Sequence, residues 1–178
     1  MTIPARIRVE HIDDYHTAHI GHGPDGTRFM AFLAATVPPG PMQDDWRTSK
    51  RWYAVLHVFD ASGVHLRTEH TFVGTTADGE AKVLQQARER RDAMVAALGH
   101  ATGGELTRGD VEVALFATTI EGHVFGLVDT TDEEHGPRVT LLPQGFVFTP
   151  PWDGLFDAGD VELRVVRAEA GARARGMR

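Results

Sequence analysis

The sequence contains no cysteine, which excludes disulfides, zinc–thiolate sites, iron–sulfur clusters and thiol nucleophiles together. It also has only two serines, Ser49 and Ser62, and neither stands in the Gly-x-Ser-x-Gly motif of serine hydrolases. Strand and helix patterns do not alternate along the chain, so the Rossmann and P-loop folds are not expected. No cofactor is therefore predicted.

Long apolar runs are absent as well. The first ten residues include Pro4, Arg6, Arg8 and Glu10 and lack the apolar core of a signal peptide. No segment approaches the length of a membrane span. These two absences predict a cytoplasmic protein that does not insert into a membrane.

The charge balance is acidic. Lys and Arg number 18 against 25 Asp and Glu, which gives a formal net charge of -7. Such a charge repels nucleic-acid phosphates, so nucleic-acid binding is not expected. Only Lys50 and Lys82 are lysine, and the preference for arginine is typical of a bacterial protein from a GC-rich genome.

Turn-forming residues between apolar segments predict a series of antiparallel hairpins. Gly23 to Gly26 separates residues 16–22 from 27–37, and Asp60 to Gly63 separates 52–59 from 64–73. Further strands are expected at 6–12, 111–118, 123–128, 138–142 and 146–148, with a last one at 160–166. The apolar residues of 29–34 lie on both faces, which predicts a central strand covered on both sides.

A single long helix is predicted between these groups of hairpins. Thr76 or Asp78 can cap its start, apolar residues recur every three to four positions from Val83 to Leu98, and Gly99 is expected to end it. We therefore predict an α+β fold, with antiparallel sheet or sheets of hairpins packed against one amphipathic helix. The predicted domain spans residues 1–170, followed by a frayed tail at 171–178.

Histidines and carboxylates near the start of the chain are the residue types that bind metals. However, His16 and His22 would lie about 20 Å apart on an extended strand, and His19 would point the other way. No metal site is therefore assigned. Asp14 or His19 with His57 or His70 remains a hypothetical metal or acid–base centre, and His57 could pair with His70 across a ladder.

The strongest candidates for a binding surface are aromatic and acidic. Pro150 and Pro151 rigidify a loop that contains Trp152, Asp153 and Asp157, and Trp46 lies in a second polar loop. A structural alternative is that Trp152 packs over an open end of the sheet. The acidic loop 129–135 is a weaker candidate.

Several motifs resemble those of an uncharacterised bacterial protein family. They are the residues Thr68 to Thr75, the turn at 121–122 with the following Phe125-Gly126-Leu127, and the loop Pro151-Trp152-Asp153-Gly154. The resemblance covers about half of the chain and implies that residues 68–157 form one unit. No activity is known for that family, so it implies no catalytic residue.

Two functions from different classes follow. The first is a non-catalytic intracellular protein-binding module, of the adaptor or immunity type, whose acidic charge suits a basic protein partner. The alternative is a small metal-dependent or His/Asp acid–base enzyme. A homodimer formed by strand addition at the edge strand 6–12 is a further expectation.

Overall fold

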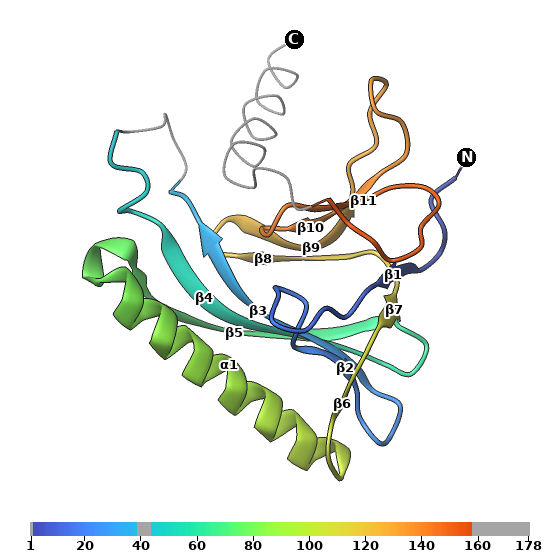
Figure 1. Ribbon diagram of the computed structural model, residues 1–178, viewed down its shortest axis with the longest axis horizontal. Helices are drawn as coiled ribbons and strands as arrows, with labels where there is room; N and C mark the ends of the chain where they lie inside the picture. Colours follow the sequence, from blue (N-terminus) through green and yellow to red (C-terminus); the bar gives the residue numbers. More distant parts are fainter. Residues whose placement is uncertain (1, 39–43, 158–178) are drawn as a thin grey trace. The chain divides into compact units, whose positions relative to one another are not determined.

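The computed structural model describes residues 2–38 and 44–157, and its fold is α+β with three antiparallel sheets (Figure 1). The chain divides into two compact units. One unit comprises residues 6–114, and the other comprises residues 2–5 and 115–157. The predicted fold class is confirmed, and the single domain over 1–170 stays a prediction.

The larger unit contains a five-stranded sheet in the order β5-β4-β3-β2-β6. Its strands are β2 (Ile20–His22), β3 (Arg28–Thr36), β4 (Arg51–Phe59), β5 (His65–Thr75) and β6 (Thr107–Arg108). Both predicted hairpins of this unit are confirmed, because β2 pairs antiparallel with β3 and β4 pairs antiparallel with β5. The central strand β3 is largely buried, as predicted from its apolar residues.

Helix α1 (Glu80–Thr102) covers one face of this sheet (Figure 1). A short 3-10 helix, η1 (Thr76–Asp78), precedes it, and Asp78 accepts hydrogen bonds from the backbone and the hydroxyl of Thr75. The predicted end at Gly99 is wrong by one turn. Gly99 stays helical, whereas Gly103 has a φ of 88° and takes the left-handed conformation that ends helices.

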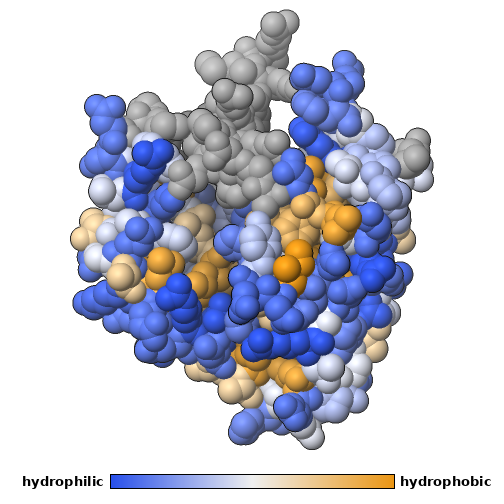
Figure 2. Space-filling model, viewed as in Figure 1, coloured by the Kyte–Doolittle hydropathy of each residue, from blue (hydrophilic) through white to orange (hydrophobic). Residues whose placement is uncertain are grey.

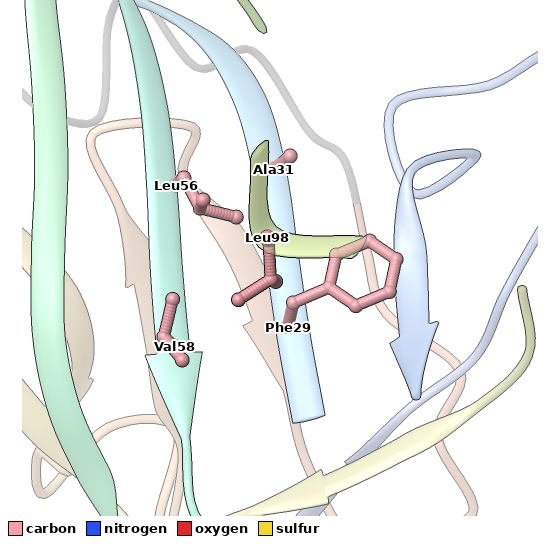
Figure 3. Close-up of a cluster of buried hydrophobic side chains, with 5 residues drawn as sticks. All are labelled: Phe29, Ala31, Leu56, Val58 and Leu98. Atoms are coloured by element: carbon pink, nitrogen blue, oxygen red, sulfur yellow. The ribbon is translucent and has the colours of Figure 1, made fainter. Parts of the chain in front are cut away.

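The contact between helix and sheet is a buried apolar cluster (Figure 3). Leu98 extends from α1 over strands β3 and β4 and is 4% exposed. Its neighbours in the cluster are Phe29, Ala31, Leu56 and Val58. The helix therefore provides the predicted cover for β3 on this face.

A two-stranded sheet completes the larger unit. It pairs β1 (Ile7–Val9) with β7 (Val111–Val113). The prediction of one strand over 111–118 is wrong, because β7 ends at Val113 and the next strand begins at Phe116 in the other unit. At the break, the N–H of Ala114 donates to the carbonyl of Gly63 at 2.8 Å instead of continuing the ladder.

The second unit contains a four-stranded sheet in the order β11-β10-β9-β8. Its strands are β8 (Phe116–Ile120), β9 (His123–Asp129), β10 (Val139–Leu142) and β11 (Phe146–Phe148). Each strand pairs antiparallel with the next, which confirms the predicted turns at 121–122 and 143–145. The predicted strand at 160–166 and the tail at 171–178 lie outside the described residues.

The surface is mostly polar on the face shown in Figure 2, where apolar residues form separate patches among hydrophilic ones. Over the part of the chain that the structure describes, no helix combines the length and the apolar character that crossing a membrane requires.

Candidate functional site

The predicted recognition loop follows β11 and spans residues 149–157. Its far end is tied to the sheet, because Asp157 and Val147 exchange backbone hydrogen bonds of 2.9 and 3.0 Å. Next to Asp157, the ring of Phe156 stacks on Phe146 with centroids 4.7 Å apart and lies 5.6 Å from Phe148. These contacts hold the loop in one place on the four-stranded sheet.

Trp152 lies at the bend of this loop and is half-buried. Its φ is 62°, a left-handed conformation that bulky residues rarely adopt, and its N–H donates to the carbonyl of Thr149 at 3.0 Å. The indole Nε1 is buried, and no hydrogen-bond partner is found for it among the described residues. Trp152 is therefore part of the packing under the loop as well as a candidate contact residue.

The outer side of the loop combines carboxylates with an apolar side chain. Asp153 and Asp157 are exposed, and Asp153 Oδ1 accepts the N–H of Leu155 at 3.1 Å. Leu155 is 60% exposed, more than any other exposed large apolar residue in the described ranges. The structure thus brings three of the four predicted binding residues onto one anchored loop and adds Leu155, which the sequence analysis missed.

Trp46 is the fourth predicted binding residue, and it lies in the other unit, between β3 and β4. It is half-buried. The guanidinium of Arg47 and the ammonium of Lys50 lie 5.1 and 5.5 Å from the centroids of its ring system, within cation–π range. Two cations therefore lie over the ring of Trp46, while the exposed Asp44 and Asp45 directly precede it in the chain.

The acidic loop after β9 is organised internally. Asp132 accepts the N–H of His135 at 2.7 Å and a hydrogen bond from Arg138. The backbone bond from His135 is the main cause that lowers the pKa of Asp132. The carboxylate of Asp132 therefore stabilises the turn between β9 and β10. Glu133 and Glu134 are the exposed acidic residues of this loop.

His57 is fully buried on β4, on the face that points away from α1. Its Nδ1 lies 2.8 Å from Thr68 Oγ1, and that hydroxyl lies 2.9 Å from Nε2 of His65. Burial, and then the charge of His65, lower the pKa of His57 to about 3. Burial also lowers the pKa of His65. His57 does not stand opposite His70, the pairing considered for it, because Thr68 stands opposite His57 and Val55 stands opposite His70.

The other residues of the acid–base hypothesis lie in different surroundings. His70 is exposed on β5, and Asp14 is exposed in a turn with a φ of 57°. In the described ranges, no three His, Asp or Glu side chains are placed to hold one metal ion.

A groove of about 780 Å³ lies in the larger unit, beside the second half of α1. Phe29, Val95 and Leu106 contribute apolar lining, and Glu105 and Arg108 contribute opposite charges. His19 also lines it, and burial, followed by the charges of Arg91 and Arg108, lowers the pKa of that imidazole. The lining therefore mixes both charges with apolar surface and points to no single class of ligand.

Gly21, Gly23 and Gly26 have the spacing of a dinucleotide-binding motif. That motif needs a strand before it and a helix after it, so that the helix N-terminus can hold a pyrophosphate. Here the three glycines stand in and after β2 and lead into the antiparallel strand β3. They form a hairpin and not a phosphate-binding turn.

Comparisons of the chain with protein-family models, with curated proteins and with solved structures give no match. The resemblance to a bacterial family therefore stays a hypothesis, and the function has to be argued from the structure of this chain.

Proposed function

We propose that the protein is a non-catalytic binding module of the adaptor or immunity type, and that loop 149–157 contacts a basic protein partner. One observation carries the proposal. Leu155 is 60% exposed on a loop that Phe156 and the Val147–Asp157 backbone bonds anchor to the sheet. An anchored loop loses little conformational entropy on binding, which favours affinity.

The expected chemistry of the partner follows from the charges. Asp153 and Asp157 lie on either side of Leu155, and the whole chain carries a formal net charge of -7. Opposite charge on the partner would speed the encounter and fix its orientation, while Leu155 would supply the apolar centre of the contact. The proposal keeps the cytoplasmic location that the sequence predicts.

Affinity capture from the source cell at low salt tests the proposal, with wild type compared with Leu155→Ser and Asp153→Lys. Val124→Ser is the matched control, since Val124 is 43% exposed on β9 in the same unit. The captured protein is then purified, and its dissociation constant is measured by calorimetry. Removing one apolar anchor is expected to weaken binding about tenfold, with a larger loss for Asp153→Lys and less than about twofold for the control.

Two results would contradict the proposal. One is that no protein is captured in stoichiometric amount. The other is that Leu155→Ser and Asp153→Lys bind the captured protein as tightly as Val124→Ser does. Binding is also expected to weaken as salt concentration rises, because exposed charge pairs are screened.

The acid–base enzyme stays the alternative, but no observation on the described residues favours it. His57 is enclosed in the core, whereas His19 lines the groove beside α1, where none of the other three residues of that hypothesis lies.

A further inference from the structure

Strand β5 forms one edge of the five-stranded sheet. It has 11 residues and pairs with β4 along one side, and the ladder is irregular at Leu66 and Val73, so residues 67–72 form its regular stretch. Over residues 2–38 and 44–157, no strand pairs with its other side. The opposite edge of the sheet, β6, has two residues. An edge of this length presents a row of backbone donors and acceptors that another strand can satisfy.

Exposed apolar side chains gather along this edge. Val64, Leu66 and Phe72 are 47%, 57% and 40% exposed. Val64 directly precedes β5, and the other two lie on it. Apolar groups that gather at an unpaired strand edge are typical of a surface that another chain covers.

The charges on β5 are complementary to those of a second β5. Arg67 and Glu69 are two positions apart, so their side chains lie on the same face, and they form an ion pair of 2.9 Å. Charged residues on an edge usually prevent strand pairing. In an antiparallel pair centred on Thr68, however, Arg67 of each copy would stand opposite Glu69 of the other, at the separation where opposite charges attract.

We propose that β5 pairs antiparallel with β5 of a second copy of this chain, about a two-fold axis at Thr68. The axis is perpendicular to the sheet, so the two five-stranded sheets join into one and α1 of each copy lies on the same side. In this register Leu66, where the β4–β5 ladder is irregular, lies opposite His70 of the other copy, and Val64 lies near Phe72. Strand β1, within the predicted edge 6–12, is also an edge of its two-stranded sheet, but it has three residues, so β5 offers the longer edge for strand addition.

Sedimentation equilibrium over a wide concentration range tests the dimer on the full chain. Wild type is expected to dimerise reversibly. Arg67→Glu places two glutamates opposite each other at two symmetry-related positions, so we expect the dimer dissociation constant to rise about tenfold or more. Glu69→Arg should raise the dissociation constant by a similar factor, because the new arginine would stand opposite Arg67 of the other copy.

The double variant Arg67→Glu with Glu69→Arg is the decisive measurement. It exchanges the two charges, restores opposite signs across the proposed pair, and is expected to return the dissociation constant to within about threefold of wild type. Arg88→Glu is the matched control, because it makes the same charge change at an exposed position of α1. It should leave the dimer intact. Circular dichroism of each variant confirms folding.

Three results would overturn the proposal: a monomeric wild type, a dimer that both single variants leave unchanged, or single variants that the double variant does not rescue. Amide exchange gives a second readout, since the amides of residues 67–70 that point away from β4 should become protected as protein concentration rises. The inference is independent of the proposed function, because β5 and loop 149–157 lie in different units. Leu155→Ser should not change the dimer.

Discussion

The burial of His57 should make the protein less stable in mild acid. In the folded state, burial and the neighbouring His65 lower the pKa of His57 from 6.5 to about 3. The unfolded chain therefore binds a proton at His57 at pH values where the folded chain does not. Stability must rise with pH wherever the unfolded state holds more protons, so the loss begins near pH 6.5 and grows as the pH falls toward 3.

The size of the effect follows from the same linkage. One pKa unit corresponds to about 1.4 kcal/mol, so moving from pH 7 to pH 5 should remove about 2 kcal/mol of unfolding free energy through His57 alone. Domains are usually stable by about 5–15 kcal/mol, so a loss of this size is measurable.

The assay is denaturant unfolding at pH 7 and pH 5, followed by circular dichroism, for wild type and His57→Gln. Glutamine does not titrate and can still reach Thr68 with a hydrogen bond. Wild type should lose about 2 kcal/mol more than the variant between the two pH values. The difference removes the contributions of His16 and His19, whose pKa values are also lowered. Equal losses in the two proteins would refute the reasoning.

Three substitutions test the packing and the backbone. Trp152→Ala should cost about 2 kcal/mol in a denaturation curve because the indole is half-buried, and an unchanged midpoint would contradict a packing role for Trp152 under the loop. Leu98→Ala should cost about 2–5 kcal/mol by emptying the cluster under α1, and a loss below about 1 kcal/mol would contradict that packing. Gly103→Ala should cost about 1 kcal/mol of unfolding free energy, because Gly103 has a φ of 88°, and this loss should lower the melting temperature by a few degrees. A Cβ would meet nothing within 4 Å at Gly103 or at Gly109, so Gly109→Ala is the control, and an equal effect of both would argue against the left-handed cap.

Much of the fold could be predicted because hairpins and helices depend on residues that are close together in the sequence. The turn Asp60 to Gly63 and the alternating residues beside it predict β4 and β5, and the structure confirms them. The same applies to the turn at 121–122. The spacing of apolar residues from Val83 to Leu98 likewise predicts a helix that buries one face on a sheet, and Val83, Ala87 and Leu98 are buried.

The candidate site could be predicted only in part. Prolines and acidic residues indicated loop 149–157 as a candidate. The order of Leu155 and Phe156 in the sequence, however, does not say which of the two side chains is packed and which is exposed. Phe156 turns onto Phe146 and Phe148, and Leu155 is left outside. That choice depends on the backbone bonds between Val147 and Asp157, which no local pattern reveals.

By itself, the sequence determined the antiparallel hairpins, the long helix between them, the class of fold and the absence of thiol chemistry. These depend on local conformation and on residue spacing, which act over a few positions. Tertiary structure alone decided that the alternating stretch 111–118 breaks into strands of two units, that His57 meets Thr68 and His65, and that β5 is an edge strand among the described residues. Each of these outcomes depends on which distant segments pair. The residues of one strand do not by themselves identify the strand with which it pairs.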